Sequence, residues 1–455
     1  MKKTLKEIAD WLGIDSGKYS DEVVTGISID TRTLKKGDLF IPFHGEAVNG
    51  HKFVQQAFEK GAAAALWLKD EPNPPKDKPI LFVDDSEIAL QQMARKYRNE
   101  HKAKFIGVTG SNGKTSSKDI LASMLEPFYK VQKTIGNFNN QLGLPITILS
   151  LDEDTEVAVL EMGMSGFGEI EFLSNLAKPH YAIITNIGEA HMQDLGSREG
   201  IAKAKFEIIK GLQSDGTLFF DGDEPLLQSL VAKTTNLNSR ACGFSKDNDL
   251  FATTIETTDK GSQFTVSGEI NGEFFIPVLG KHQVKNALNA MLLGRALGLT
   301  TEQIRTGLAQ VKLTDMRMQL VSTENGPLFI NDAYNAAPTS MKAAIQFVQA
   351  TTIRDDKWLV LGDMLELGEN EEQFHKQLSE VIDAKEISKV CLFGPRMKWL
   401  YEQLLNSFTK DDLVYTENDY DVIVQTINNY ASNNSLILLK GSRGMKLETI
   451  LKSFQ

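Results

Sequence analysis

A short apolar strand, a glycine-rich loop and a helix follow one another at residues 105–118, and no other feature restricts the fold as strongly. The strand Phe105-Ile-Gly-Val leads into Thr109-Gly-Ser-Asn-Gly-Lys-Thr, and the helical pattern begins near Ser116. In this context the backbone N–H groups of the loop turn towards an anion at the N-terminus of the helix. The pattern predicts an α/β sheet with a nucleotide phosphate site at the end of this strand.

Two side chains of the loop add to this prediction. Lys114 supplies a positive charge, and Thr115 offers a hydroxyl group to Mg²⁺. Gly110 and Gly113 enclose only two residues, whereas the general phosphate-loop pattern has four before its Gly-Lys pair. An ordinary Gly-Asn turn before a helix is therefore the alternative, which the strand, loop and helix context disfavours.

Charge and composition exclude several classes of protein. The 455 residues include 49 Lys and Arg against 60 Asp and Glu, and the net charge of −11 argues against nucleic acid or an anionic membrane as the main partner. Cys242 and Cys391 lack metal-ligand spacing and are expected to be free thiols in a reducing cytosol.

No segment is typical of secretion or membrane insertion. Glu7 and Asp10 interrupt the apolar positions of the N-terminal segment, which is typical of an amphipathic helix and not of a signal peptide. The longest apolar run, 62–68, is far shorter than the roughly 20 residues that span a bilayer. We expect a cytoplasmic protein.

The chain divides into three segments, 1–101, 102–313 and 314–455. The first alternates short strands and helices and is expected to be a small α/β domain. The second contains the phosphate loop and changes at 216–278 to short alternating runs, which indicate antiparallel strands appended to a parallel core. The third repeats strand then helix, which is typical of an open parallel, Rossmann-like sheet with helices on both faces.

Polar residues that directly follow apolar strands are the site candidates of the second segment, because ligands bind beyond the carboxyl ends of parallel strands. Glu161 follows the strand predicted at 157–160 and could bind Mg²⁺. Its alternative is a strand-end carboxylate in solvent. His191 follows the strand predicted at 181–184, but a lone histidine is more often a hydrogen-bonding loop residue.

Lys205 lies at an unusual position in a helix predicted over 197–212. Ile201, Lys205, Ile208 and Leu212 are spaced i, i+4, i+7 and i+11, which places this lysine on the apolar stripe. From the pattern alone, its stem packs and its ammonium group reaches solvent or a carboxylate.

Two strand ends of the third segment place charged groups in a similar way. Asp332-Ala-Tyr-Asn follows the strand predicted at 328–330, and Lys440-Gly-Ser-Arg follows the one at 436–439. Lys440 and Arg443 could bind a phosphate or a carboxylate.

Taken together, these motifs resemble those of the Mur ligases, which are ATP-dependent amide-forming enzymes of peptidoglycan synthesis. The resemblance runs through all three segments. It rests on Thr109-Gly-Ser-Asn-Gly-Lys-Thr, Gly136-Asn-Phe-Asn-Asn-Gln-Leu-Gly-Leu-Pro, Leu160-Glu-Met-Gly, Asn186-Ile-Gly-Glu-Ala-His and Gly280-Lys-His-Gln-Val-Lys-Asn-Ala.

The branch of the family is indicated by further blocks. Asp332-Ala-Tyr-Asn-Ala-Ala-Pro-Thr-Ser-Met, Leu361-Gly-Asp-Met-Leu-Glu-Leu-Gly and Lys440-Gly-Ser-Arg resemble the branch that adds D-alanyl-D-alanine. Asp30-Thr-Arg, which folate-glutamate ligases lack, resembles the block that binds the uridine-diphosphate sugar. The chain departs from the family at two positions. Gln283 stands where Asn is usual, and Ala337 stands where the commoner Asn-Ala-Asn-Pro motif has its second Asn. Both positions are expected nucleotide contacts.

The resemblance implies a two-step reaction. ATP phosphorylates the terminal carboxylate of UDP-N-acetylmuramoyl-tripeptide, and the amine of D-alanyl-D-alanine attacks the acyl phosphate. It implies ATP, two Mg²⁺ ions and a lysine carbamylated by CO₂ at Lys205, with Lys114, Glu161, His191 and Lys205 as catalytic residues. The implied metal ligands are Thr115, Glu161, His191 and Lys205.

The resemblance also assigns the remaining site residues. It gives the UDP-sugar to segment 1–101, ATP to 102–313, and the dipeptide with part of ATP to 314–455. The expected partners are these small molecules, with no nucleic acid and no membrane, and the expected state is a monomer. The implied ATP residues are Thr109, Gly110, Ser111, Asn112, Gly113, Lys114, Thr115, Ser116, Asn286, Arg317, Asp332 and Asn335. The implied substrate residues are Ser28, Asp30, Thr31, Arg32, Gly45, Asn49, His51, Asn137, Asn139, Asn140, Lys440 and Arg443.

Three other interpretations are open. The nearest is a sister ligase that adds a single amino acid or glutamate. A GTPase-type switch is disfavoured because no Asn-Lys-x-Asp guanine motif follows the phosphate loop. A nucleotide-binding protein without catalysis is disfavoured by the joint presence of Lys114, Glu161, His191 and Lys205.

Overall fold

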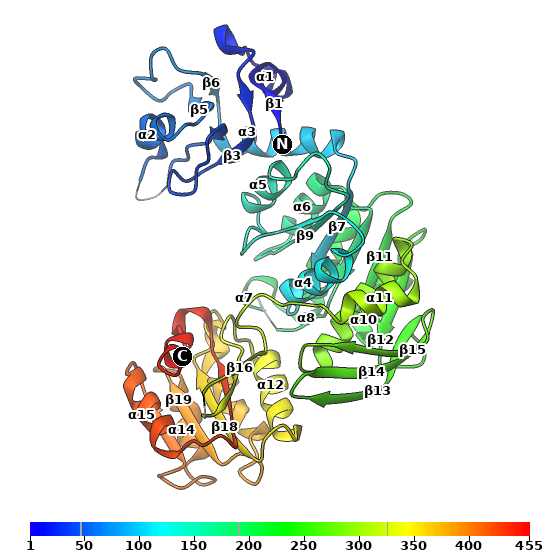
Figure 1. The fold of residues 1–455 in the computed structure, drawn as a ribbon, viewed down its shortest axis with the longest axis vertical. Helices are drawn as coiled ribbons and strands as arrows, with labels where there is room; N and C mark the ends of the chain where they lie inside the picture. Colours follow the sequence, from blue (N-terminus) through cyan, green and yellow to red (C-terminus); the bar gives the residue numbers. More distant parts are fainter. Residues whose placement is uncertain (46–47, 190–191, 325) are drawn as a thin grey trace. The chain divides into compact units, whose positions relative to one another are not determined.

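The computed structural model describes residues 1–45, 48–189, 192–324 and 326–455 (Figure 1). These residues form two compact units. The first unit comprises 1–109, 128–182 and 207–217, and the second comprises 110–127, 183–206 and 218–455. Parallel sheets with helices make up most of both units, so the predicted α/β class is confirmed. The predicted segment boundaries after residues 101 and 313 stay predictions.

The first unit begins with a parallel sheet in the order β3 (Gly26–Ser28), β4 (Asp38–Phe40), β5 (Ala64–Leu68) and β6 (Ile80–Val83). β5 lies within the apolar run at 62–68 and is almost entirely buried, as strands of parallel sheets are. The other elements of this region are β1 (Lys3–Thr4), α1 (Leu5–Leu12), η1 (Gly17–Tyr19), β2 (Val23–Val24), η2 (Gly50–Phe53), α2 (Val54–Glu59) and α3 (Ser86–Glu100).

A nine-stranded sheet contains the strands on which the phosphate site depends. The order is β15 (Gly272–Ile276), β14 (Gly261–Gly268), β13 (Leu250–Thr258), β12 (Asn238–Gly243), β11 (Thr217–Asp221), β10 (Tyr181–Ile184), β7 (Lys104–Thr109), β9 (Val157–Glu161) and β8 (Val131–Lys133). β7 and β9 are parallel, and β13, β14 and β15 are antiparallel, as predicted, whereas β8, which pairs in parallel with β9, was not predicted. β12 pairs with β13 in parallel, so the prediction of antiparallel strands over the whole of 216–278 is wrong there.

The helix after the phosphate loop is α4 (Lys114–Leu125). It begins two residues before the predicted start near Ser116, because Gly113 adopts a φ of 79° and ends the loop there. Residues 115–125 are all buried, since α10 (Lys281–Ala296) and α11 (Thr301–Leu308) pack on α4. Gly307 allows this packing: a Cβ atom there would lie 2.3 Å from the Met124 carbonyl oxygen.

The helix predicted over 197–212 consists of α8 (Arg198–Phe206) followed by the 3₁₀ helix η3 (Glu207–Lys210). Lys205 is 1% exposed, whereas Lys203 and Lys210 are exposed. The predicted place of Lys205 on the apolar stripe is therefore confirmed.

The last sheet has the order β16 (Gln319–Ser322), β17 (Leu328–Asn331), β21 (Ser435–Lys440), β18 (Asp356–Gly362), β19 (Lys389–Phe393) and β20 (Leu413–Thr416). Five strands are parallel, and β16 is an antiparallel edge strand that the sequence analysis missed. Successive residues of β18 face opposite cores. Trp358 and Val360 pack with α15 (Tyr420–Tyr430) and α16 (Glu448–Lys452), and Leu359 and Leu361 pack with α12 (Pro338–Ala350) and α14 (Met397–Leu404). Helices thus cover both faces of the sheet, as predicted.

Shorter elements connect these sheets. Among the described residues, no helix is both long and apolar enough to cross a membrane. The connecting elements are α5 (Gly143–Leu149), α6 (Glu169–Ala177), α7 (Met192–Leu195), α9 (Pro225–Ala232), η4 (Gly368–Asn370), α13 (Glu371–Lys376), η5 (Gln377–Val381) and η6 (Arg443–Met445).

Candidate active site

The phosphate loop is shaped by close packing against the residues that follow β10. Gly110 has a φ of 149°, and a Cβ atom there would lie 1.9 Å from the Thr185 hydroxyl oxygen. That hydroxyl donates to the Asn112 carbonyl at 2.5 Å. Only glycine fits at residue 110, so the first glycine of the motif is explained by a specific contact.

Asn186 holds the tip of the same loop. Its main-chain carbonyl accepts from Ser111 N at 3.1 Å, and its side-chain oxygen accepts from Asn112 N at 2.9 Å. Gly188 N donates to the Ser111 hydroxyl at 2.8 Å. Thr185 and Asn186 were not predicted as site residues, although they directly follow a strand, as Glu161 does, and ligands bind beyond the ends of parallel strands.

Polar contacts surround the start of α4. The Lys114 ammonium group donates to the Gly110 carbonyl at 2.7 Å, and the Arg317 guanidinium donates to the Thr115 hydroxyl at 2.9 Å. The Arg317 guanidinium also lies over the Tyr334 ring, 4.3 Å from its centroid. The structure therefore brings Lys114, Thr115 and Arg317 to one end of α4, and adds Tyr334, which the sequence analysis missed.

Gln283 occupies the position at which the family usually has Asn. Its amide donates to the Ser116 hydroxyl at 3.4 Å and accepts from the Asn286 amide at 3.0 Å. The Asn286 amide in turn lies 3.1 Å from the position of a Cβ atom on Gly113. This chain of contacts connects α10 to the loop.

Glu161 ends β9 and is only 3% exposed, so the alternative of a carboxylate in solvent is wrong. Its side chain accepts from the Asn139 amide at 2.9 Å, and its main-chain N donates to the Thr134 hydroxyl at 2.9 Å. Thr109, at the end of the neighbouring strand β7, donates to the Met162 carbonyl at 2.9 Å. A buried carboxylate at a strand end is a fitting ligand for a hard cation.

The other two asparagines of this region differ from Asn139. Asn140 accepts from the main-chain N–H groups of Leu142 and Gly143 at 3.2 and 2.9 Å and so orders the chain at the start of α5. Asn137 is exposed. His191 lies outside the described residues.

Lys205 is buried on α8, and its surroundings disfavour the charged form. Burial lowers the pKa of Lys205 well below its usual value, and the positive charge of Lys114 lowers it further. A lysine with a lowered pKa presents more of the neutral amine, which is the form that reacts with CO₂.

At the ends of β17 and β21, Asp332, Asn335 and Lys440 form what we call the C-terminal cluster. The Lys440 ammonium group is buried and lies 2.5 Å from the Asp332 carboxylate and 3.1 Å from the Asn335 carbonyl. Arg443 is instead exposed on η6 and paired with Glu448 at 2.5 Å. The two basic residues predicted to bind a phosphate or carboxylate thus have different environments.

The Asp30-Thr-Arg block of the first unit is held by its own contacts. Arg32 hydrogen-bonds to the Asp30 carboxylate and thereby lowers the pKa of Asp30. The Ser28 hydroxyl donates to the Asp30 carbonyl at 2.9 Å, and the Thr31 hydroxyl donates to Gln56 at 2.9 Å. Arg32 is 84% exposed, so its guanidinium is accessible to a ligand.

Asn49 and His51 form a second polar group in the first unit. The Asn49 amide donates to Glu71 at 3.1 Å, and its oxygen accepts from His51 Nδ1 at 2.9 Å. Leu68 N donates to His51 Nε2 at 3.3 Å, so both ring nitrogens of His51 already have hydrogen-bond partners. His44, His51 and Glu71 lie close enough together to hold a metal ion, but a metal would have to displace one of these hydrogen bonds. Burial lowers the pKa of His51 and so favours the neutral imidazole. Gly45 N donates to the Val48 carbonyl at 3.0 Å in the loop before Asn49.

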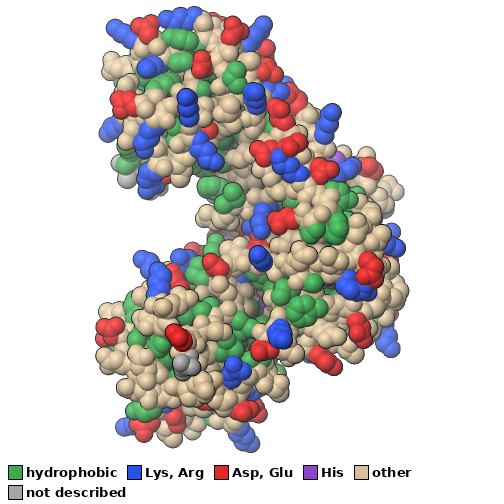
Figure 2. All heavy atoms as spheres, in the orientation of Figure 1, with side chains coloured by type: hydrophobic (Ala, Val, Ile, Leu, Met, Phe, Trp, Pro, Cys, Tyr) green, Lys and Arg blue, Asp and Glu red, His purple; other side chains and the backbone are tan. Residues whose placement is uncertain are grey.

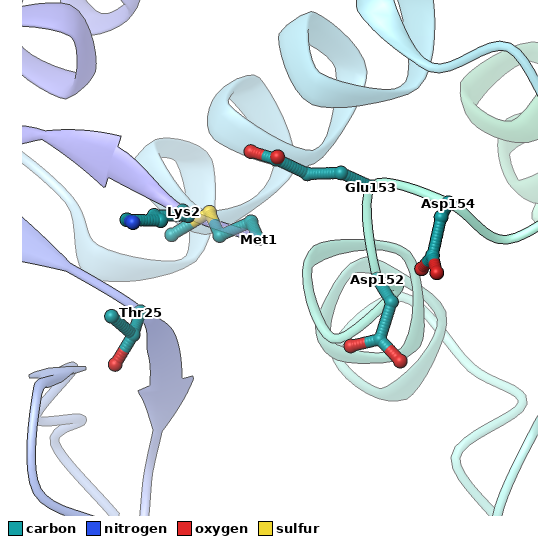
Figure 3. Close-up of a pocket in the computed structure, with 6 residues that line it drawn as sticks. All are labelled: Met1, Lys2, Thr25, Asp152, Glu153 and Asp154. Atoms are coloured by element: carbon teal, nitrogen blue, oxygen red, sulfur yellow. The ribbon is translucent and has the colours of Figure 1, made fainter.

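The first unit also has a cavity of about 360 Å³ that contains none of the predicted site residues (Figure 3). Asp152, Glu153 and Asp154 supply its carboxylates and lie opposite Lys2 and Thr25. Three carboxylates would repel an anionic nucleotide. On the face drawn in Figure 2, acidic and basic side chains are interspersed, with no continuous basic surface.

The predicted residues are divided between the two units. The phosphate loop from Gly110, Lys205, Asn286, Arg317 and the C-terminal cluster belong to the second unit. The first unit contains the Asp30-Thr-Arg block, the Asn49 group, Asn137 to Asn140 and Glu161.

Three family models match the chain in order. The model described as "Mur ligase family, catalytic domain" matches residues 23–98, "Mur ligase middle domain" matches 108–294, and "Mur ligase, glutamate ligase domain" matches 316–443.

Similar proteins match over nearly the whole chain. The UDP-N-acetylmuramoyl-tripeptide–D-alanyl-D-alanine ligase of Bacillus subtilis is 48% identical over 99% of this chain and 98% of its own. A crystal structure of MurF from Acinetobacter baumannii matches with a TM-score of 0.89 and 28% identity, covering 100% of this chain and 99% of that one. MurF ligase from Thermotoga maritima, solved in complex with ADP, matches with a TM-score of 0.83 and 27% identity, covering 95% of this chain and 97% of that one.

Proposed function

The chain belongs to the Mur ligase family, and from this we propose that it joins D-alanyl-D-alanine to UDP-N-acetylmuramoyl-tripeptide with hydrolysis of ATP. The products are UDP-N-acetylmuramoyl-pentapeptide, ADP and phosphate. The observation that carries this function is the 48% identity, over 99% of the chain, to a ligase named for this reaction. It selects this branch above sister ligases that add one amino acid.

The reaction proceeds in two steps because a carboxylate is a poor electrophile. A carboxylate oxygen of the tripeptide attacks the γ-phosphorus of ATP, the bond to ADP breaks, and an acyl phosphate forms. The amine nitrogen of the dipeptide then attacks the acyl carbon, the bond to phosphate breaks, and the amine loses a proton. The transfer between two anions needs positive charge and fixed hydrogen-bond donors.

The phosphate loop supplies these groups. The loop residues bind the ATP phosphates, and Lys114 neutralises the charge that develops on the transferred group. The other residues proposed to contact the phosphates are Thr109, Gly110, Ser111, Asn112, Gly113 and Ser116. The close contact of Gly110 with Thr185 fixes the shape of the loop before the nucleotide binds, so little reorganisation is needed.

Two oxygen donors of the chain suit magnesium by their chemistry. Thr115 offers a hydroxyl and Glu161 a buried carboxylate, both of which are hard ligands, and His191 is proposed to assist at a second ion. When bound, magnesium neutralises phosphate charge. Asn139 orients the Glu161 carboxylate through its amide, which is a positioning role.

Lys205 is proposed to react with CO₂, so that its neutral amine forms an N–C bond and loses a proton to give a carbamate. The change converts a buried amine into an anion that can ligate a metal, and the lowered pKa of Lys205, which favours the neutral amine, supports it. In Lys205→Ala, activity should be lost and partly rescued by a short carboxylic acid. Unchanged activity in the variant would exclude the carbamate.

The remaining proposed contacts follow the domain order. Segment 1–101 binds the UDP-sugar, 102–313 binds ATP, and 314–455 binds the dipeptide and part of ATP. Asn286, Arg317, Asp332 and Asn335 contact the nucleotide. Lys440 and Arg443 meet the γ-phosphate or the dipeptide carboxylate, and the exposure of Arg443 suits the carboxylate of an incoming substrate. The substrate residues of the first unit are Ser28, Asp30, Thr31, Arg32, Gly45, Asn49, His51, Asn137, Asn139 and Asn140. We propose a monomer that acts in the cytoplasm, where ATP is available.

Product analysis tests this function. Phosphate release is measured with ATP, Mg²⁺ and UDP-N-acetylmuramoyl-tripeptide ending in either lysine or diaminopimelate, with D-alanyl-D-alanine, D-alanine or D-glutamate as the amine. We expect release and a pentapeptide mass only with the dipeptide. Release with a single amino acid would keep the family and overturn the branch, and absence of release with any amine would overturn the ligase function.

A further inference from the structure

Arg317 makes a direct contact with the hydroxyl group of Thr115. Its Nη2 donates to Thr115 Oγ1 at 2.9 Å, and Thr115 is 8% exposed. Both residues belong to the second unit. A guanidinium that donates to an oxygen uses one of the lone pairs with which that oxygen would bind a metal ion.

The guanidinium of Arg317 also makes a contact with an aromatic ring. Its carbon lies over the Tyr334 ring, 4.3 Å from the ring centroid. Tyr334 N donates to the Met316 carbonyl at 3.3 Å, so the ring and the arginine segment are linked through the backbone as well.

The backbone around Arg317 is strained. Met316 and Met318 have φ values of 63° and 51°, a region that residues other than glycine seldom adopt. Met318 N donates to Asp332 at 3.1 Å, and Asp332 is paired with Lys440. Strained residues of this kind persist only where the surroundings hold them, and they cluster at sites that change conformation.

The position also leaves one polar group of Arg317 unsatisfied. Its Nε atom is buried and has no hydrogen-bond partner among residues 1–45, 48–189, 192–324 and 326–455. A buried donor without a partner is unfavourable. Arg317 is therefore held at Nη2 and at its planar face, while the hydrogen-bond donor at Nε is unused in this position.

We propose that Arg317 occupies the metal position at Thr115 until a nucleotide binds, and so excludes divalent cations from the loop. This inference rests on the proposed role of Thr115 as a magnesium ligand. Like charges repel at this range, so a dication and the guanidinium do not share the hydroxyl. The ATP phosphates attract the guanidinium away from Thr115, which admits the cation together with the nucleotide.

Binding of Mn²⁺ to the full chain without nucleotide tests the proposal. Electron paramagnetic resonance counts free and bound Mn²⁺ over a titration of wild type, Arg317→Met and Arg317→Lys. Arg317→Met should gain a site with affinity at least about tenfold above wild type, since the charge is removed while the stem over Tyr334 is kept. Arg317→Lys keeps the charge and should match wild type. Arg317→Gln replaces the methionine variant if thermal unfolding shows that the latter does not fold.

Two further variants test whether the gained Mn²⁺ site depends on the Thr115 hydroxyl and is specific to Arg317. In Arg317→Met/Thr115→Val the gained site should disappear, because the hydroxyl ligand is removed. Arg305→Met is the matched control, since Arg305 also lies over a ring, 4.9 Å from the centroid of Phe274, but pairs with Glu302; it should match wild type. No gain in Arg317→Met, or a gain that persists without the Thr115 hydroxyl, overturns the proposal. If product analysis still gives the pentapeptide, the proposed function stands.

Discussion

The phosphate loop and the C-terminal cluster both place a lysine at the end of a parallel strand, but they organise it differently. In the phosphate loop, Lys114 donates to a neutral carbonyl of the loop itself, and close packing at Gly110 sets the shape. In the C-terminal cluster, the charge of Lys440 is matched by Asp332 at 2.5 Å. The first arrangement depends on the backbone, and the second is an ion pair between a buried lysine and a partly buried carboxylate.

This difference separates ligand binding from stability. A change in the loop backbone should alter the shape that meets the phosphates. A change in the ion pair of Lys440 and Asp332 should leave a largely buried charge without its partner, which is costly even when no ligand is present. Variants of the loop should therefore change mainly the affinity for nucleotide, and variants of the C-terminal cluster should change mainly the free energy of unfolding.

The largest effect is expected for Gly110→Ala. The added Cβ atom would lie 1.9 Å from the Thr185 hydroxyl, and φ is 149°. Strain and overlap each cost about 1–3 kcal/mol, so ADP affinity measured by calorimetry should fall at least about 100-fold. Gly110→Ala/Thr185→Ala should recover part of the loss.

Gly298→Ala is the matched control for this substitution. Gly298 has a φ of 95°, but nothing lies within 4 Å of its Cβ position. Only conformational strain is introduced, so stability should fall by about 1 kcal/mol with unchanged ADP affinity. Wild-type ADP affinity in Gly110→Ala would show that the backbone does not set the phosphate site.

The second effect concerns stability and belongs to the C-terminal cluster. Lys440→Met leaves the Asp332 carboxylate without its partner, and the free energy of unfolding in a urea titration should fall by about 3 kcal/mol. Asp332→Asn/Lys440→Met should be more stable than Lys440→Met alone, because no unpaired charge remains. Equal stability of the single and double variants would contradict the role of the ion pair.

The sequence predicted the elements that depend on local pattern. The strand predicted at 105–108 corresponds to β7 (Lys104–Thr109). The glycine-rich loop and the two covered faces of the last sheet were also predicted correctly, because the spacing of apolar residues and of glycines is a local property of the sequence. β5 was not assigned, because a fully apolar run has no period that separates a strand from a helix. β16 was missed because it is a short edge strand that is only partly buried.

For the candidate site, residue types were predictable but their partners were not. The phosphate loop motif indicated Gly110, yet the reason for that glycine is Thr185, which is 75 residues away. The contact of Arg317 with Thr115 spans 202 residues. Such pairings depend on which strand ends meet in the fold, and sequence periodicity contains no information on them.

Lys205 is a third lysine that can be compared with Lys114 and Lys440. It is buried, and its surroundings lower its pKa. In CO₂-free buffer without metal, Lys205→Met should raise the free energy of unfolding by about 1–4 kcal/mol near pH 7, because a buried amine, which gives up its proton or its hydration on folding, is replaced by an apolar chain of similar length. Activity should be lost in the same variant. Chemical unfolding at several pH values measures the difference.

The pH dependence of this difference has a defined sign. The folded-state pKa of Lys205 lies well below 10.5, so between the two values the unfolded chain binds more protons than the folded one. Wild type should therefore gain stability relative to Lys205→Met as pH rises towards 10.5. A gap that stays constant between pH 7 and 10 would contradict a lowered pKa.

The smallest effect is expected for Gln283→Asn, which restores the residue usual in the family and shortens the contact with the phosphate-loop helix. The 3.4 Å bond to the Ser116 hydroxyl should be lost, and one buried methylene is removed, so stability should fall by about 1 kcal/mol. Because Gln283 contacts Ser116 and Asn286 and not the loop backbone, KM for ATP should change less than about threefold. A change in KM above tenfold with unaltered stability would mean that the side chain meets the nucleotide directly. In that case α10 would contribute to nucleotide binding as much as the loop does. The phosphate site would then depend on side chains as well as on the loop backbone, and it would differ less from the C-terminal cluster.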